Sequence, residues 1–286
     1  MVDEKKEAEL NQRYFKREYP ITEDNKLAQQ RYITKKSKGQ SPTLTEEKAL
    51  AYIVSKINPT DKELGPIEYD IKEFCDICGF DERQSYVRVR EVLDGLLSRR
   101  AWIDRENGDS DGYTYFSHIH ASKGSGKGYV EINDKLKSYF INMKGNFYQF
   151  PLHDILAMKT ARGIQLYKLL KSLYFKNRNI EFDIETLKGY LDCVGKYPEF
   201  KVFRKKVLRP ALEDINTYSD LQVDLETVKE GKYVKKVIFH TVDLLKNALP
   251  EDIDEYNRRH RNVDREIDPD QLVFAEIYDG MGDYPL

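Results

Sequence analysis

The segment YPEFKVFRKKVLRPALEDIN, residues 197–216, carries the clearest structural signal in this chain of 286 residues. Pro198 stands where proline favours the first turn of a helix. Apolar residues then recur at helical spacing, which predicts one buried face. The opposite face carries a row of basic residues at i, i+4 and i+8 with one neighbour beside it: Lys201, Lys205, Arg209 and Lys206. From 198 to 210 there are five basic residues and one acidic residue, so this face is strongly cationic.

The elements expected around this helix are those of a winged helix, in which a helix-turn-helix is followed by a β-hairpin. The chain predicts, in order, a helix at 153–174, a short helix at 183–191, a turn at 192–198, the long helix at 199–216, and strands at 221–228 and 233–242. The two strands are joined across the turn KEGK, as a hairpin requires. The long helix therefore occupies the place of a recognition helix.

The same order of elements recurs earlier in the chain. Helices are expected at 43–57, 70–78 and 82–100, followed by strands at 101–104, 112–119 and 128–132. Thr43 and Glu46 have the spacing of a capping box just before an apolar run. The segments YDIKEF at 69–74 and FDIETL at 182–187 also have similar sequences. A repeat of this length indicates duplicated domains, because a solenoid repeats every 20 to 50 residues or so.

The fold class that follows is α+β: two tandem winged-helix domains, mainly helical, each with a β-hairpin wing. We divide the chain into a flexible N-terminal arm at 1–40, a first winged-helix domain at 41–150, a second at 151–245 and an acidic C-terminal tail at 246–286. The first domain is expected to contact DNA, to mediate dimerisation, or both. The second is expected to provide most of the DNA binding.

Composition restricts the class of protein. No apolar run approaches the roughly 18 residues that a membrane span needs. The three cysteines are too few for a disulfide framework, and the N-terminus lacks the pattern of a secretory signal, so we expect a cytoplasmic protein. The net charge of −2 hides a segregation: residues 151–245 carry 17 basic and 13 acidic groups, and residues 246–286 carry 5 and 11. Such asymmetry suggests a localised site for a polyanion.

The second domain supplies most of the candidate DNA contacts. In a helix-turn-helix the second helix enters the major groove, where Arg and Lys reach guanine edges and phosphates. The candidates there, in the helix and its wing, are Lys201, Arg204, Lys205, Lys206, Arg209, Lys232 and Lys235. Arg204 has an angle inside the apolar stripe, from which its long side chain could still reach solvent. The plain alternative is a solvated basic face with no ligand.

The long helix of the first domain is less basic. Its candidate contacts are Arg83, Gln84 and Arg90, with Val87 exposed between them and Glu91 on the same surface. This helix makes either weaker DNA contacts or a surface for self-association, and the residues alone do not separate the two.

Three sequence patterns that could indicate an enzyme site are incomplete. Cys75 and Cys78 have the spacing of half a zinc or redox site, but no second pair completes it. The string SKGSGKGY at 122–129 lacks the first glycine of a phosphate loop and has Gly128 where Ser or Thr must hold magnesium. His118 and His120 could share one side of a strand, without an accompanying carboxylate or cysteine motif. We therefore predict no active site, no metal and no cofactor.

Several segments together resemble one family. They are LTEEKALAYIVSKI at 44–57, YVEINDKLKSYFINMKGNFYQFPL at 129–152, GIQLYKLLKSLY at 163–174, FRKKVLRPALEDIN at 203–216 and the wing at 221–242. The resemblance is to the plasmid replication initiator proteins, the iteron-binding initiators of the RepE, RepA and π type, and it covers about 41 to 245.

This resemblance implies a function beyond what spacing shows. It implies a protein that binds direct repeats at an origin as a monomer, with each recognition helix in a major groove, and helps to open the adjacent AT-rich DNA. It also implies homodimers that repress their own gene, and contacts with a host initiator ATPase and a replicative helicase. The family's basic cluster falls on Arg204, Lys205 and Lys206. One departure is Gln165, where the family commonly has Arg. The alternative function is a tandem winged-helix transcription regulator without a role in replication.

Overall fold

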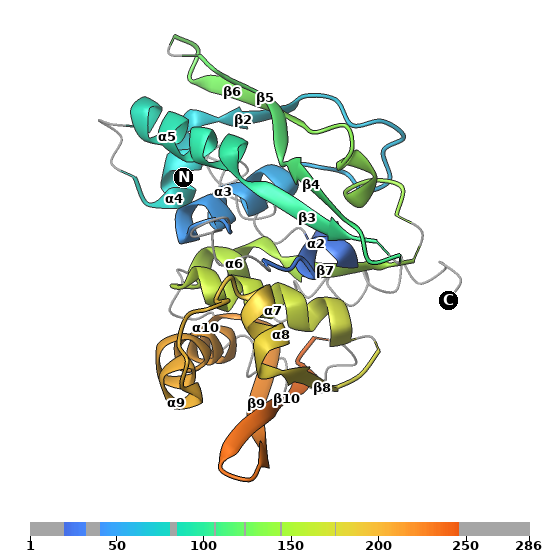
Figure 1. The fold of residues 1–286 in the computed structure, drawn as a ribbon. Helices are drawn as coiled ribbons and strands as arrows, with labels where there is room; N and C mark the ends of the chain where they lie inside the picture. The colour runs from blue at the N-terminus through green and yellow to red at the C-terminus, as the bar shows by residue number, and fades with distance from the viewer. Residues whose placement is uncertain are drawn as a thin grey trace.

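The computed structural model describes residues 20–32, 41–80, 85–105, 107–122, 124–143, 145–174 and 176–245 (Figure 1). Arg83, Gln84, residues 1–19 and 33–40 of the predicted arm, and the whole predicted acidic tail at 246–286 lie outside these ranges.

The second winged helix occupies the lower half of the molecule in Figure 1. Its helices and strands follow in the order α7 (Ala161–Tyr174), β8 (Asn179–Asp183), α8 (Ile184–Tyr190), α9 (Phe200–Phe203), the π-helical η3 (Arg204–Leu208), α10 (Arg209–Tyr218), β9 (Leu221–Glu230) and β10 (Tyr233–Asp243). The sheet has the strand order β8-β10-β9, with all pairs antiparallel. Helices α9 and α10 continue through η3 as one long helix, as the sequence predicts.

The first winged helix repeats this topology. It consists of α3 (Leu44–Val54), β2 (Ile67–Asp70), α4 (Ile71–Cys78), α5 (Ser85–Ser98), β5 (Phe116–Ala121) and β6 (Lys127–Ile132). Its sheet order, β2-β6-β5, matches that of the second domain strand for strand. An additional hairpin, β3 (Arg100–Asp104) with β4 (Ser110–Thr114), follows α5 and forms a separate sheet. The prediction of two tandem winged helices is confirmed.

Local signals set the helix boundaries of the first domain. Thr43 and Glu46 form the predicted capping box: each side chain accepts a hydrogen bond from the other residue's backbone N–H, at 3.3 Å and 2.7 Å. Asp70 caps α4 by accepting from the N–H of Glu73 at 2.9 Å. Gly79 ends α4 at a φ of +69°, a conformation that side chains with a Cβ rarely adopt.

The predicted N-terminal arm is wrong for residues 20–32. β1 (Pro20–Asp24) pairs antiparallel with β7 (Phe147–Pro151), and α2 (Asn25–Ala28) follows it. Ile21 is 1% exposed and Leu27 is 7% exposed, so this short segment contributes apolar side chains to the core. The prediction failed because the partner strand lies more than 120 residues away and leaves no local signal. The predicted domain boundary at 150 falls within that partner, β7.

The single helix predicted at 153–174 is divided into α6 (Leu152–Ala157) and α7. The break is held by Asp214 of α10, whose carboxylate accepts from the backbone N–H of Lys159 and Thr160 at 3.1 and 2.7 Å. Thr160 in turn accepts from the N–H of Gly163 at 2.9 Å, which caps the first turn of α7. The recognition helix is thereby joined to the start of α7.

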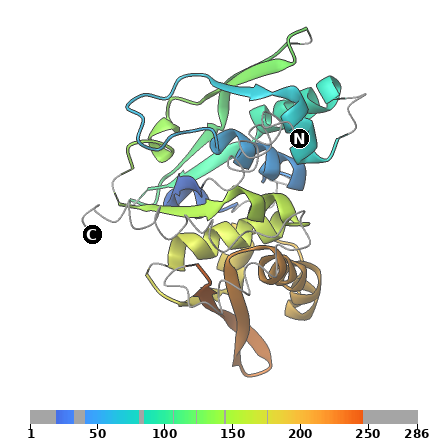
Figure 2. The same ribbon diagram turned by 180° about the vertical axis from the view of Figure 1, so that it is seen from behind.

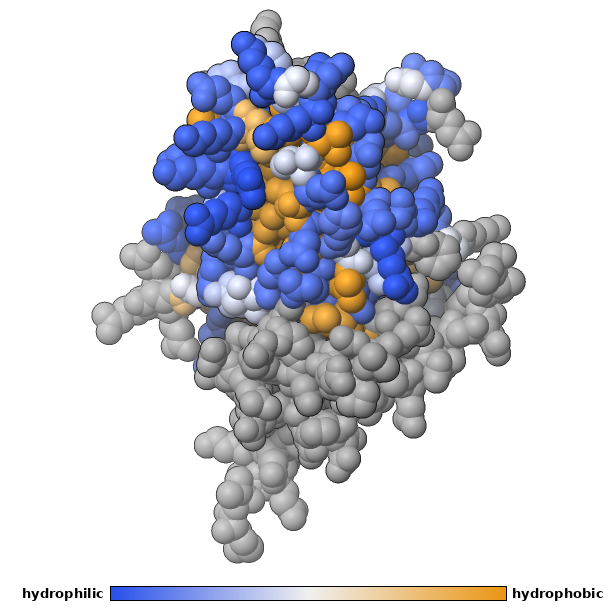
Figure 3. Space-filling model, turned by 90° about the horizontal axis from the view of Figure 1, so that it is seen from below, coloured by the Kyte–Doolittle hydropathy of each residue, from blue (hydrophilic) through white to orange (hydrophobic). Residues whose placement is uncertain are grey.

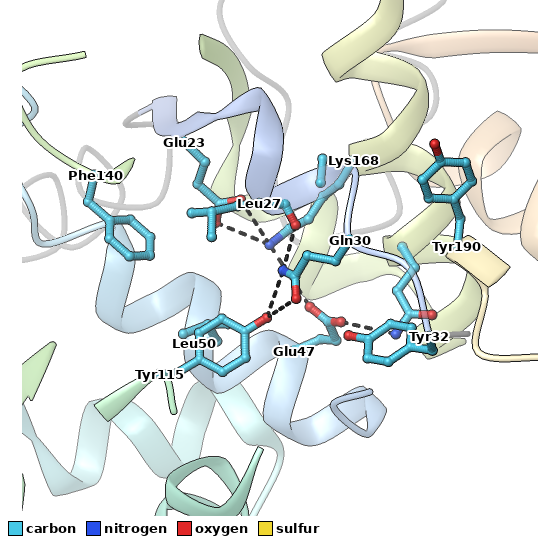
Figure 4. A pocket seen from close by; sticks show the side chains of 12 residues that line it. Glu23, Leu27, Gln30, Tyr32, Glu47, Leu50, Tyr115, Phe140, Lys168 and Tyr190 are labelled. Atoms are coloured by element: carbon cyan, nitrogen blue, oxygen red, sulfur yellow. Dashed lines mark hydrogen bonds and ion pairs between the residues drawn. The ribbon is translucent and has the colours of Figure 1, made fainter. Parts of the chain in front are cut away.

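Buried ion pairs join α7 to β1 and α3. Lys168 of α7 lies 3.2 Å from a carboxylate oxygen of Glu23 in β1 and 3.9 Å from one of Glu47 in α3. All three side chains are buried, and Tyr148 of β7 donates to Glu23. Figure 4 shows Glu23, Glu47 and Lys168 among the residues that line a pocket where α7 faces α3, with Gln30 at its centre beside Tyr115. Burial raises the pKa of Glu47, and the Lys168 cation opposes that rise.

Among the residues that the structure describes, one further helix, η2 (Lys137–Tyr139), is a single turn between β6 and β7.

Candidate nucleic-acid interface

The exposed face of the long helix in the second domain is cationic. The five predicted basic residues, Lys201, Arg204, Lys205, Lys206 and Arg209, are all exposed. Among the residues that the structure describes, an ion pair forms only at the last of these, where Arg209 lies 2.9 Å from Glu213. The other four cations therefore carry no intramolecular counter-charge within the described ranges. Concentrated positive charge of this kind attracts a polyanion.

Arg204 lies on the surface, not inside the apolar stripe where its angle in a straight helix would place it. The cause is the π-helical stretch η3, in which the backbone N–H of Arg209 donates to the carbonyl oxygen of Arg204, five residues back. The buried side of the helix consists instead of Phe203, Val207 and Leu208 and the residues that follow them.

The turn before this helix is held by charged side chains. Asp192 and Tyr197 adopt positive φ values of 49° and 53°, which gives the sharp reversal between α8 and α9. The Asp192 carboxylate accepts from Ser41 at 3.1 Å and from the Arg162 guanidinium at 3.3 Å. Since Ser41 belongs to the first domain and Arg162 to α7, these contacts hold the beginning of the turn after α8 against both.

The wing of the second domain extends away from the body of the protein (Figure 1). Lys232 and Lys235, the two predicted contacts, are both exposed at its tip. Lys235 lies 3.4 Å from Glu230, an exposed pair of small energetic value. Tyr233 was not singled out from the sequence. It is 62% exposed with the Lys232 ammonium 5.2 Å from its ring centre, and an aromatic residue between two turn lysines is the signal that could have identified it.

Figure 3 shows the second-domain end of the molecule from below. Hydrophilic side chains cover most of its described surface and surround a smaller apolar area. Val202 of α9, 39% exposed, and Val228 of β9, 36% exposed, are among the large apolar side chains exposed in the second domain.

The long helix of the first domain, α5, presents a mixed surface. Arg90 is exposed, with its guanidinium 5.8 Å from the ring centre of Tyr86. Arg88 pairs with Glu91 at 2.9 Å, and Val87 is 58% exposed. The role of Arg90, like the roles of Arg83 and Gln84, stays a prediction.

The two long helices lie on the same side of the molecule. In Figure 1 both α5 and the α9–α10 helix are at the left, and in Figure 2, seen from behind, both are at the right. The two wings point to opposite ends, β5–β6 upward and β9–β10 downward. A single elongated ligand along this side could therefore contact both domains.

Gln165, the residue that departs from the expected pattern, belongs to the contact between α7 and α3. Its side chain donates to Glu47 at 3.3 Å and accepts from Arg162 at 2.6 Å. It lines the pocket of Figure 4 and is only partly exposed.

The glycine-rich string and the two histidines lie together on the wing of the first domain, where Glu131 is 3.5 Å from His118. β5 ends at Ala121 and β6 begins at Lys127, so the glycine-rich string at 122–129 ends within strand β6. His118 and His120 flank the Tyr129 ring across that hairpin, with centroids 5.4 and 4.9 Å away. Within the described ranges, no group of three His, Cys, Asp or Glu side chains could hold a metal ion. No helix in the part of the chain that the structure describes is long and apolar enough to cross a membrane.

We expect the Cys75–Cys78 pair to be chemically inert. Cys75 is fully buried, and burial raises the pKa of Cys78 to about 12, so almost no reactive thiolate forms at neutral pH. Iodoacetamide should alkylate the native protein at least about tenfold more slowly than a free thiol, whose pKa is about 8.5. Unfolding in urea should make all three cysteines reactive, which is the control. Rapid alkylation of Cys78 in the native protein, followed by mass spectrometry, would contradict the assignment.

Comparisons with known proteins agree with this architecture. The family model described as Initiator Replication protein, WH1, matches residues 21–171, and Initiator Rep protein, WH2, matches residues 183–241. A replication initiation protein of Escherichia coli is 24% identical over 187 residues, 64% of this chain. The chain spans 57% of the length of that curated relative.

Among solved structures, the chain is similar to the Pi initiator protein in complex with iteron DNA. The TM-score is 0.65 at 16% sequence identity, and the match covers 79% of this chain and 98% of the other. At this level of identity the likeness concerns the fold, and it extends over both winged helices.

Proposed function

Because the chain belongs to the Initiator Replication protein family, we propose that it binds double-stranded DNA at repeated origin sequences and promotes opening of the neighbouring DNA. The proposed protein is a cytoplasmic, non-enzymatic initiator of plasmid replication that can also repress its own gene. The observation that carries the proposal is a set of four exposed cations on the second helix of a helix-turn-helix, which form no ion pair with the residues that the structure describes: Lys201, Arg204, Lys205 and Lys206. Support comes from a structural neighbour that was solved with iteron DNA.

The second domain is proposed to bind most strongly. Its long helix enters a major groove, where Lys and Arg reach guanine edges, while Lys232 and Lys235 of the wing contact the backbone. The exposed position of all these residues supports this arrangement. In the first domain, Arg83, Gln84 and Arg90 are proposed to add weaker contacts in the next major groove. The placement of α5 and α9–α10 on one side of the molecule supports two contacts with one duplex.

The proposal also includes partners that follow from the family alone. These are a second copy of the chain, in a homodimer, and the initiator ATPase and replicative helicase of the host.

Affinity for the repeat should depend steeply on salt. If about six phosphates are neutralised, the logarithm of the binding constant should fall with a slope of roughly −5 against the logarithm of salt concentration. Lys205→Ala and Lys206→Ala should each reduce the slope by roughly 1 and leave the melting temperature unchanged, because both side chains are exposed. Fluorescence anisotropy between 50 and 300 mM salt measures this. Lys62→Ala, in the loop between α3 and β2, is the matched control. A flat salt response would mean that the cationic face binds no DNA.

Strand opening distinguishes an initiator from a transcription regulator. The protein should occupy direct repeats and make an adjacent AT-rich block sensitive to permanganate, which oxidises unpaired thymines. Occupation of one inverted repeat with no permanganate sensitivity would favour the regulator and overturn the proposal.

A further inference from the structure

The recognition helix of the second domain contains one residue more than that of the first. The segments YVRVREVLDGLL at 86–97 and FKVFRKKVLRPAL at 200–212 correspond position by position, apart from one addition. Val89 and Leu93 are fully buried, four positions apart, whereas the equivalent Phe203 and Leu208 are fully buried, five positions apart. Beyond this point the two helices agree again, since Leu96 and Ala211 are both fully buried.

The extra residue is accommodated in the π-helical turn η3. An α-helix would require the N–H of Arg209 to donate to Lys205, but it donates to the carbonyl of Arg204. Pro210 gives a physical reason for the position of this turn. Proline has no N–H to donate to Lys206, and its ring crowds the carbonyl four residues before it. A wider turn at this place relieves that contact.

The wider turn changes which side chains face outward. In a straight α-helix each residue turns by about 100° around the axis. Measured from Phe203, Val207 would lie at about 40°, Arg204 at about 100° and Leu208 at about 140°, so Arg204 would lie between the other two. It would then be among buried residues. With one more residue in the turn, the Leu208 side chain points closer to the direction of the Phe203 side chain. The buried residues then occupy a narrower sector of the helix surface, and Arg204 lies outside that sector.

We propose that this inserted residue and Pro210 determine sequence recognition, because together they set the directions in which the basic side chains meet the DNA. The inference rests on the proposed function and adds a positioning role for the inserted residue and for Pro210. The insertion gives three consecutive exposed cations, Arg204, Lys205 and Lys206, while both halves of the helix keep their core contacts. Helix register, and not charge alone, then controls affinity for the specific site.

Deletion of Lys206 tests this proposal against Lys206→Ala, which removes the same charge and keeps the turn. The probes are a duplex selected by the wild-type protein from a random pool and a scrambled duplex of equal length. Lys206→Ala should weaken both complexes by the same factor. The deletion should reduce affinity for the selected duplex at least about tenfold further, because one well-placed base contact contributes that much. Its affinity for the scrambled duplex should equal that of Lys206→Ala. The melting temperature should fall by several degrees, because a straight turn brings the Pro210 ring against the carbonyl four residues before it. Binding is therefore compared at a temperature at which both variants are folded.

A deletion variant that equals Lys206→Ala on both duplexes would overturn the proposal. So would one that fails to fold, since the core would then need the extra residue. Pro210→Ala gives an independent test with length and charge unchanged. It should lose about threefold affinity for the selected duplex alone and keep its stability, whereas wild-type affinity would exclude a role for Pro210. If the wild-type protein selects no sequence from the pool, the proposed function itself fails, and that outcome is distinct from the others.

Discussion

Replacing Phe203 with alanine should lower the free energy of unfolding by about 3–5 kcal/mol, the cost of removing a fully packed aromatic side chain. Phe203 is 0% exposed, its ring lies 6.2 Å from that of Tyr197 in the preceding turn, and the Lys188 ammonium lies 5.8 Å from its centre. The side chain thus joins the recognition helix to both the turn and α8. Urea unfolding followed by circular dichroism measures the loss.

The neighbouring residue provides a matched control for this substitution. Val202 is 39% exposed on the same turn of helix, so Val202→Ala should change the stability by no more than about 0.5 kcal/mol. DNA binding by Phe203→Ala should decline only in proportion to the fraction unfolded. If Phe203→Ala unfolds at the same urea concentration as the wild type, the buried face of this helix has been assigned wrongly.

The burial of Phe203 and Val207 could be predicted from the sequence because apolar spacing along one helix is a local signal, whereas Leu212, expected to be buried with them, is only partly buried. The same spacing placed the basic residues on the opposite face. It left Arg204 uncertain, since a constant angle of about 100° per residue does not allow for a π turn. The signal that could have resolved it is Pro210 together with the one-residue difference between the two domains.

Non-local pairing explains what the sequence did not predict. β1 reads PITED, with too little alternation to indicate a strand, and it forms through the ladder to β7. The single strand expected at 112–119 is two strands in different sheets. Thr114 ends the pairing with β3, and Phe116 begins the pairing with β6. The alternation of residues along a strand does not show where the strand changes its pairing partner. The sequence therefore did not separate the additional hairpin of the first domain from the wing.

The contact of α7 with β1 and α3 was equally hidden from the sequence. Its central cation is Lys168, within the part of the predicted helix at 153–174 that forms α7, but its partners Glu23 and Glu47 come from β1 and α3. A lysine on a helix is usually exposed. Only the three-dimensional arrangement reveals that this one is buried between two carboxylates. Under the proposed function the two long helices need a fixed separation to contact one duplex, so these ion pairs would serve DNA binding as well as stability.

Replacing Lys168 with alanine should therefore destabilise the whole protein by about 3–5 kcal/mol at pH 8, because it leaves Glu23 and Glu47 buried without their cation. Lys176→Ala, an exposed lysine just beyond α7, should have an effect below about 0.5 kcal/mol. Thermal and urea unfolding of both variants give the comparison.

The cost of Lys168→Ala should shrink as the pH falls. The pKa of Glu47 is already raised above its ordinary value of 4.5 by burial, and loss of the Lys168 cation, which opposes that rise, moves it further upward. A carboxyl group with a raised pKa in the folded state binds its proton more tightly there than in the unfolded chain. Its stabilising contribution is therefore complete below the unfolded value and is lost as the pH rises through the folded one. Relative to the wild type, the variant should thus be least stable at pH 8 and recover toward pH 5.

Adding Glu23→Gln to Lys168→Ala should restore part of the lost stability, because one buried charge is then removed. Equal destabilisation at both pH values, with no rescue by Glu23→Gln, would mean that Lys168 acts through the packing of its alkyl chain and not through its charge.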